Sequence, residues 1–280
     1  PLLFTPFQLT LLNYIGVYAL VALGLVLLTG MGGLTSFGQA AFVGIGAYAT
    51  AWLTTRYGAS PWLGLVAALV ITGTVAALLG AVTLRLGGHF LPLSTIAWGI
   101  AIFFLFGNIP GLGGHDGMSR VPPVTVGGFS FAPNAAMHYL VWAFVGGAAW
   151  LTSNLLESRE GRAIRSLRGG AVMVESLGVS VFRARLMAFV IAALLAATSG
   201  WLYAHIVRFV SPAPFDVRPS IDYLLMAMAG GSGHVVGAIL GSAMVTLLKN
   251  WLQDVLPWFT GNAAQFEIVV FSILFVLLLQ

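Results

Sequence analysis

The sequence predicts an all-α integral membrane protein, a polytopic bundle of about eight transmembrane helices with glycine-broken segments in both halves. Of the 280 residues, 59% are hydrophobic and only 7% are charged, whereas a soluble domain carries about 25% charged residues. Apolar runs recur along the whole chain, and a spanning helix takes about 20 residues plus a connection. We therefore expect a single transmembrane domain over residues 1–280.

Five uninterrupted apolar runs predict spanning helices, because a backbone in lipid must satisfy its own hydrogen bonds. They cover residues 8–29, 62–84, 138–156, 186–207 and 263–279. Three further stretches are apolar but are cut by glycine, proline or polar residues, namely 39–54, 91–108 and 220–256. The sequence leaves their path open, and it does not decide whether residues 30–54 cross the membrane or re-enter it.

Basic residues set the expected orientation. Six of the 12 Lys and Arg residues lie within 27 positions, in the loop that covers residues 157–185. Short loops rich in Lys and Arg stay on the cytoplasmic side of a membrane. We therefore expect residues 157–185 to form a cytoplasmic loop and residues 109–137 to form a periplasmic one.

The cytoplasmic loop predicts two short helices. Glu157 and Glu160 precede Arg162, Arg165 and Arg168, an order that suits the helix dipole, and Gly169 and Gly170 end the first helix. A helix of about nine residues is marginal alone in water, so we expect the pair to dock on a partner protein. An anchor on anionic lipid headgroups is the open alternative.

Glycine gathers at two places, one in each half of the chain. Each group interrupts an apolar segment, and together they comprise Gly30, Gly32, Gly33, Gly38, Gly44 and Gly46, then Gly230, Gly231, Gly233, Gly237 and Gly241. Broken hydrophobic segments in corresponding positions of two halves favour a substrate pathway, because irregular backbone at membrane depth must lie beside protein or a water-filled cavity. The four-residue spacing of Gly233, Gly237 and Gly241 also predicts a stripe for close helix packing.

The sequence offers no chemistry for catalysis. Cysteine is absent, which excludes thiol catalysis and zinc–cysteine sites, and no metalloprotease, nucleophile-elbow, phosphate-loop or dinucleotide motif occurs. His138 and His234 are isolated along the chain. We expect the chain not to be an enzyme, with no catalytic residue, no metal ligand and no cofactor bound by the chain itself.

An ion-coupled secondary transporter or channel is the alternative from another class. Such a carrier needs an ionisable site near mid-membrane at its helix breaks. Here Asp222 and Lys249 lie near the ends of apolar segments, within reach of an interface. The pattern therefore gives an ion-coupled carrier little support, and an intramembrane enzyme lacks any paired nucleophile and base.

Four stretches carry motifs in a definite order. Residues 33–48 read GLTSFGQAAFVGIGAY, residues 113–118 read GGHDGM, residues 161–165 and 175–178 read GRAIR and ESLG, and residues 220–226 and 230–237 read SIDYLLM and GGSGHVVG. Together they make nearly the whole chain similar to the permease subunits of branched-chain amino acid ABC importers.

The resemblance implies a multi-pass permease subunit of the bacterial inner membrane that imports leucine, isoleucine and valine. It implies a second related permease, identical or different, two cytoplasmic ABC ATPases that hold ATP and Mg, and a periplasmic substrate-binding protein. Membrane lipid surrounds such a protein, and nucleic acid plays no part. Similar permeases carry urea, short amides or other small polar solutes, so the solute stays open. We expect both ends to be incomplete, and an ATPase domain could follow residue 280.

The resemblance also assigns roles to residues. The ATPase-coupling loop would comprise Glu160, Gly161, Arg162, Arg165, Arg168, Glu175, Leu177 and Gly178. The substrate pathway would comprise Ser36, Gln39, Tyr48, Gly230, Gly231 and Ser232, where backbone amides at a helix start could meet an α-carboxylate.

Overall fold

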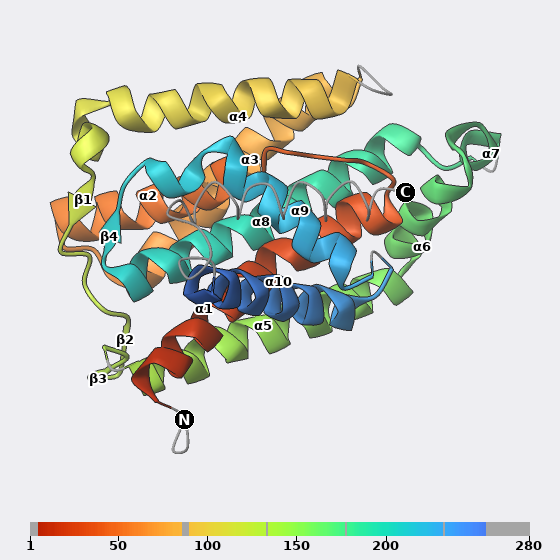
Figure 1. Cartoon of the computed structure of the whole chain (residues 1–280). Coiled ribbons are helices and arrows are strands. Elements are labelled where there is room, and N and C mark those ends of the chain that lie inside the picture. The colour runs from red at the N-terminus through yellow and green to blue at the C-terminus, as the bar shows by residue number, and fades with distance from the viewer. Residues whose placement is uncertain (1–4, 86–89, 133, 177, 232, 256–280) are drawn as a thin grey trace.

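The computed structural model describes residues 5–85, 90–132, 134–176, 178–231 and 233–255. Long helices lie side by side in one bundle (Figure 1). One end, which we call the arginine end, carries the short helices α6 (Arg159–Ser166) and α7 (Ala171–Ser176). The opposite end carries four short strands, and we call it the hairpin end.

Within the described ranges, six helices are long and apolar enough to cross a membrane. They are α1 (Pro6–Leu25) with its π-helical extension η1 (Val26–Met31), α3 (Pro61–Thr83), α4 (Phe90–Asn108), α5 (Asn134–Glu157), α8 (Val181–Val207) and α10 (Val235–Val255). Two further helices, α2 (Gln39–Tyr57) and α9 (Val217–Ala229), lie among them. The predicted all-α membrane bundle is confirmed, and the predicted run at residues 263–279 lies outside the described residues.

Local capping explains where the helices begin. Helix α8 begins five residues before the predicted run, because the Ser180 hydroxyl accepts a hydrogen bond from the Arg183 amide. Arg183 and Arg185 therefore lie on the first turns of α8 and not in the loop. Helix α5 likewise begins at Asn134, inside the predicted loop of residues 109–137.

Both predicted glycine-rich breaks interrupt helices. After η1 the chain turns back from the arginine end as an irregular stretch, and α2 begins in the interior of the bundle (Figure 1). The segment over residues 30–54 therefore starts at the arginine end, which α1 has reached, and leads back to the hairpin end, so it crosses the bundle. The second break separates α9, which has 13 residues, from α10.

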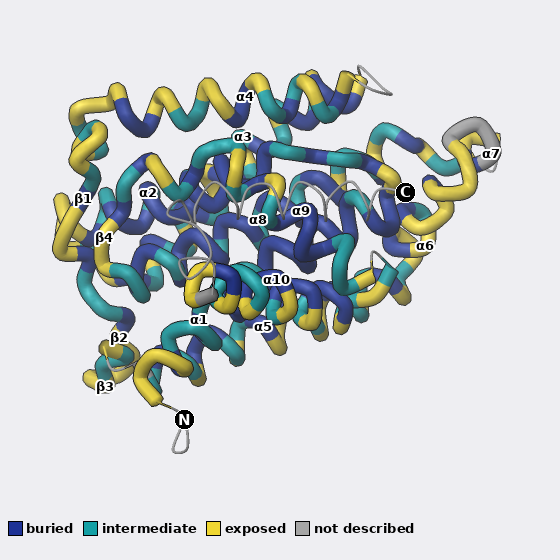
Figure 2. The backbone as a smooth tube through the Cα atoms, viewed as in Figure 1, coloured by how far each residue is buried: buried dark blue, intermediate teal, exposed yellow. Residues whose placement is uncertain are grey.

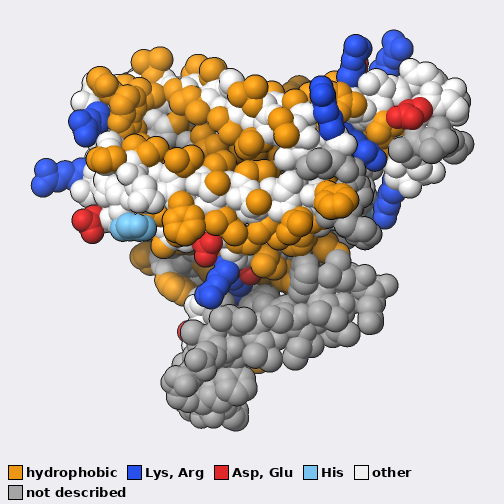
Figure 3. All heavy atoms as spheres, turned by 90° about the horizontal axis from the view of Figure 1, so that it is seen from above, with side chains coloured by type: hydrophobic (Ala, Val, Ile, Leu, Met, Phe, Trp, Pro, Cys, Tyr) orange, Lys and Arg blue, Asp and Glu red, His pale blue; other side chains and the backbone are white. Residues whose placement is uncertain are grey.

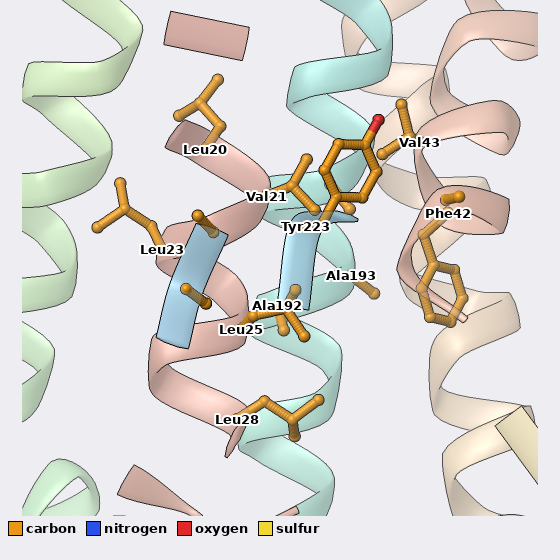
Figure 4. Packing of buried hydrophobic residues seen from close by; sticks show 14 of the residues in the cluster. Leu20, Val21, Leu23, Leu25, Leu28, Phe42, Val43, Ala192, Ala193 and Tyr223 are labelled. Carbon is orange, nitrogen blue, oxygen red and sulfur yellow. The ribbon is translucent and has the colours of Figure 1, made fainter. Parts of the chain in front are cut away.

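The core lies where α1, α2 and α8 meet, as the dark interior of Figure 2 shows. Helix α8 contributes small buried side chains, and Figure 4 shows two of them, Ala192 and Ala193, beside the leucines of α1. A Cβ added at Gly24 of α1 would lie 2.9 Å from the Ala192 Cα atom. Small residues thus let the backbones of α1 and α8 approach closely, as expected of helices packed in a membrane.

The outer surface is apolar between the two ends. Figure 3 shows hydrophobic side chains over the middle of one face, with most of the Lys and Arg side chains that it shows lying at the two ends. Large exposed hydrophobic residues on α3, α4 and α5 include Leu63, Val66, Val70, Leu78, Val82, Leu93, Phe104, Leu105, Trp150 and Leu151. Such a surface suits a lipid environment and confirms a multi-pass membrane protein.

The hairpin end is tied to the bundle by side chains from the helices. Strand β1 (Met118–Ser119) pairs antiparallel with β4 (Phe209–Val210), and β2 (Thr125–Val126) pairs with β3 (Phe129–Ser130). Short 3-10 turns precede these strands or follow them: η2 (Pro110–Leu112), η3 (Gly114–Asp116) and η5 (Ala213–Phe215). The Trp62 indole donates to the Thr125 carbonyl at 2.9 Å, and His205 Nδ1 lies 2.7 Å from the Pro122 carbonyl.

Candidate substrate pathway and coupling loop

The first break places two of the predicted pathway residues at the start of α2. Ser36 and Gln39 are fully buried, and the Ser36 hydroxyl lies 3.4 Å from the Gly38 amide that donates to it. Neither amide atom of the Gln39 side chain has a hydrogen-bond partner among the residues that the structure describes. A buried, unsatisfied amide is costly, so Gln39 offers a donor and an acceptor to a molecule that would reach this break.

Hydroxyl groups from two other helices hold the start of α2. The Ala40 amide donates to the Ser220 hydroxyl of α9 at 3.0 Å, and the Phe37 amide donates to the Thr95 hydroxyl of α4 at 3.1 Å. The first amides of a helix have no partner within the helix. These two bonds therefore give the Phe37 and Ala40 amides acceptors outside α2, and they link the first break to α4 and α9.

Replacing Ser220 with alanine is expected to destabilise this junction. The substitution leaves the buried Ala40 amide without its acceptor, a loss of about 1–3 kcal/mol. Ser242→Ala is the matched control, because the buried Ser242 hydroxyl only donates to the Ala238 carbonyl of its own helix. Thermal unfolding in detergent should show a lower midpoint for Ser220→Ala than for Ser242→Ala, and equal midpoints would contradict the assigned role of Ser220.

Tyr48 lies apart from the other predicted residues of the first break. It follows Gln39 by nine positions on α2, which is about 13 Å along the axis and about half a turn around it. Its ring stacks on Phe106 at a centroid distance of 4.5 Å and meets the edge of Phe215 at 6.0 Å. The structure therefore does not bring Tyr48 together with Ser36 and Gln39.

The second break is a close crossing of α9 and α10. A Cβ added at Gly237 would collide with the Gly230 carbonyl oxygen, and one at Gly241 would collide with the Met226 carbonyl. Gly231 has a φ of +93°, in the region that favours glycine. No atom of the described residues lies within 4 Å of a Cβ built at Gly233, and Ser232 lies outside the described residues.

A cavity of about 410 Å³ lies beside this break, and the sequence analysis missed it. Helices α1, α8, α9 and α10 supply most of its wall, and its polar members include Tyr14, Tyr18, Tyr203, Asp222, Tyr223, Thr246 and Lys249. Lys249 Nζ lies 2.6 Å from Asp222 Oδ2, so the two side chains form a partly exposed ion pair in the cavity wall.

The sequence carried one signal for this cavity. Tyr14 and Tyr18 are four residues apart and therefore share one face of α1, and their rings stack with centroids 6.0 Å apart. Asp222 and Lys249 lie 27 positions apart in the sequence, and nothing in this spacing predicts that they meet. The pairing depends on how α9 and α10 fold back on each other.

At the arginine end, α6 docks through a small apolar face. Gly161, Ile164 and Leu167 are buried, and a Cβ at Gly161 would collide with the Leu155 carbonyl of α5. Ser158 caps α6 by accepting a hydrogen bond from the Gly161 amide at 3.2 Å. The helix is thus held against the end of α5 by packing and by its cap.

The opposite face of the coupling loop is charged and exposed. Its exposed members are Glu160, Arg162, Arg165, Arg168, Glu175 and Gly178, and Leu177 lies outside the described residues. The first helix ends in the 3-10 turn η4 (Leu167–Gly169) and Gly170. The structure therefore places the described members of the predicted loop at the arginine end, and all of them except the buried Gly161 are exposed.

Two arginines of this loop also bind the end of α5. Arg162 Nη1 donates to the Glu157 carbonyl at 2.7 Å, and Arg165 Nη2 donates to the Leu156 carbonyl at 2.5 Å. Cations and donors stabilise the carbonyl end of a helix. Arg162 and Arg165 therefore position α6 on α5, which leaves Glu160, Arg168 and Glu175 as the charges turned outward.

Comparison with known proteins shows the family of the chain. Residues 7–279 match the family described as the permease component of the branched-chain amino acid transport system. The chain is 29% identical, over 85% of its length, to the high-affinity branched-chain amino acid transport system permease protein LivM of Salmonella typhimurium and to that of Escherichia coli. It is 23% identical over 85% of its length to a probable LivM permease of Methanocaldococcus jannaschii, and covers 79% of that protein.

The chain spans 62% of the length of the two enterobacterial relatives. No solved structure shows a significant match to it. The family match covers nearly the whole chain, from the first helix onward, and agrees with the bundle of apolar helices described above. The chain therefore belongs to the family of branched-chain amino acid transport permease components.

Proposed function

We propose that the chain is the permease subunit of an ABC importer that carries leucine, isoleucine and valine across the bacterial inner membrane. ATP hydrolysis in partner ATPases, which would hold ATP and Mg, drives the transport. A second related permease completes the pathway, and a periplasmic binding protein delivers the solute. The arginine end faces the cytoplasm in this arrangement, because it holds most of the basic loop residues.

The observation that carries the proposal is the docked, charged helix pair at the arginine end. Helix α6 is a short helix that is marginal alone, yet it is capped by Ser158 and fixed to α5 by Arg162 and Arg165. A rigid helix at the tip of the bundle, with its charges turned outward, is suited to receive a partner and to pass its movement to α5 and α8.

Co-purification tests the partner. The chain is extracted from its native membrane in mild detergent, once intact and once with residues 157–178 replaced by a Gly/Ser linker. We expect an ABC ATPase to accompany the intact chain only. The linker variant must retain the thermal unfolding midpoint of its apolar bundle, and a folded intact chain that brings down no ATPase would contradict the proposal.

Uptake by the recovered complex tests the solute. The complex is reconstituted into liposomes with ATP on the ATPase side, and its binding protein is added on the other side. We expect ATP-dependent uptake of labelled leucine and none of urea. Uptake driven by an ion gradient without ATP would favour the secondary-transporter alternative, and uptake of urea in place of leucine would favour the related small-solute permeases.

A further inference from the structure

The cavity between α1, α8, α9 and α10 contains one acid and one base in contact. Lys249 and Asp222 lie 2.6 Å apart, and their side chains are 26% and 29% exposed, so each keeps part of its surface open. Holding two charges within a membrane bundle is costly unless they are paired. The cavity therefore presents an acid and a base that are paired with each other and still partly exposed to it.

The remaining wall combines aromatic rings with aliphatic side chains. Tyr18 lies 5.6 Å from Tyr223 between ring centroids, and Tyr14 lies 6.5 Å from Tyr203, so the four tyrosines form a partial cage beside the ion pair. Leu11, Val17, Val43 and Met226 add apolar surface. The volume of about 410 Å³ falls in the range of about 300–1,000 Å³ typical of small-molecule sites.

One polar group in this wall points to a ligand independently. Thr246 is 8% exposed, and its hydroxyl has no hydrogen-bond partner within the part of the chain that the structure describes. A buried hydroxyl without a partner costs free energy. A bound polar molecule would recover that cost.

We propose that this cavity binds a zwitterionic amino acid, whose α-carboxylate contacts Lys249 and whose α-ammonium group contacts Asp222. The aliphatic side chain lies against Val43 and Met226, and the tyrosine rings surround the ammonium group. The inference deepens the proposed function, on which it rests for the identity of the solute, by naming residues that would recognise it.

Charge balance explains why a zwitterion fits this cavity better than a molecule with one charge or with none. The side chains of Lys249 and Asp222 neutralise each other. An amino acid that inserts between them brings one charge of each sign. Both protein charges therefore stay paired throughout. A lone carboxylate or amine would leave one protein charge without its counterpart, and neutral urea would gain no ion pair, so selectivity for the zwitterion follows. Ammonium groups are also attracted to the faces of tyrosine rings.

Binding to the purified chain tests the site without the binding protein. Saturation-transfer NMR in detergent is recorded with leucine, isopentylamine, 4-methylpentanoate and urea. We expect leucine to bind at least tenfold more tightly than the two analogues that lack one charged group, and urea to give no signal. Equal binding of leucine and either analogue would overturn the proposal.

Variants of Lys249 and Asp222 test whether the ion pair recognises leucine or only packs the helices. Lys249→Met and Asp222→Asn should each weaken leucine binding at least tenfold. Asp254→Asn is the matched control, because Asp254 is an exposed acid of α10, the helix that carries Lys249, and is not part of the cavity wall. The exchange Asp222→Lys with Lys249→Asp rebuilds the ion pair and should restore the unfolding midpoint but not leucine binding; full restoration of binding would show that the pair only packs.

Failure of this binding site and failure of the proposed import would give different results. If the reconstituted complex takes up no leucine while the purified chain still binds leucine through Lys249, the site stands and the proposed import fails. If the complex imports leucine and the Lys249 and Asp222 variants bind it as the unsubstituted chain does, the import stands and the site fails.

Discussion

Replacing Gly200 with alanine is expected to separate α2 from α8 and to destabilise the bundle. A Cβ at Gly200 would collide with the Val43 carbonyl oxygen and would lie 2.9 Å from the Ala47 amide nitrogen. Both obstacles are backbone atoms, so no side chain can rotate away. Overpacking a core costs about 1–3 kcal/mol and sometimes more, and we expect Gly200→Ala to lie at or above the upper end of that range.

Thermal unfolding in detergent measures this effect, with Gly146→Ala as the matched control. Gly146 lies within α5, and no described atom lies within 4 Å of the Cβ position. Alanine favours a helix over glycine by about 1 kcal/mol at both positions, so the difference between the two variants isolates the crossing. If Gly200→Ala unfolds at or above the midpoint of Gly146→Ala, the close crossing is not needed for stability.

In the proposed importer, exchanging the outward charges of the coupling loop is expected to uncouple the permease from the partner ATPase. The double variant Arg168→Glu with Glu175→Arg keeps the net charge of the loop, so the charge bias that orients the chain is unchanged. Both side chains are exposed, and neither belongs to the contacts that fix α6 on α5. Charge complementarity across an interface would be reversed at two positions.

The measurement is ATP hydrolysis by the reconstituted complex, with and without loaded binding protein. We expect the double variant to lose at least tenfold of the stimulated rate, which corresponds to about 1.4 kcal/mol, while its unfolding midpoint stays unchanged. Arg183→Glu serves as the control, because Arg183 is exposed at the same end but lies on the first turn of α8. Full stimulation in the double variant, or an equal loss in Arg183→Glu, would contradict the assigned surface.

Much of the fold could be predicted because it follows from apolar length. A run of about 20 apolar residues specifies a helix in lipid whatever its neighbours are, and α3 agrees with its predicted run within one residue at each end. Caps were harder to foresee. Ser180 extends α8 through two arginines that composition assigned to the loop, because a single hydroxyl at the right position outweighs local polarity.

The candidate sites were less predictable because they depend on tertiary contacts. Glycine clustering indicated both breaks, yet it could not show that Ser220 of α9 would accept the Ala40 amide of α2. The loop pattern indicated a charged docking helix, but not that Arg162 and Arg165 would turn back onto α5. These contacts join residues from different helices, and helical periodicity carries no information about which helices become neighbours.

The crossing of α2 and α8 has a mechanical consequence. Gly46 meets the Ala197 backbone, and Gly200 meets the Val43 backbone, so the two helices touch main chain to main chain at adjacent turns. Sliding one helix along the other would drive these atoms into collision, whereas tilting both as a unit would not. A push on α8 at the arginine end would therefore move α2 as well, and with it the buried Gln39 at its start.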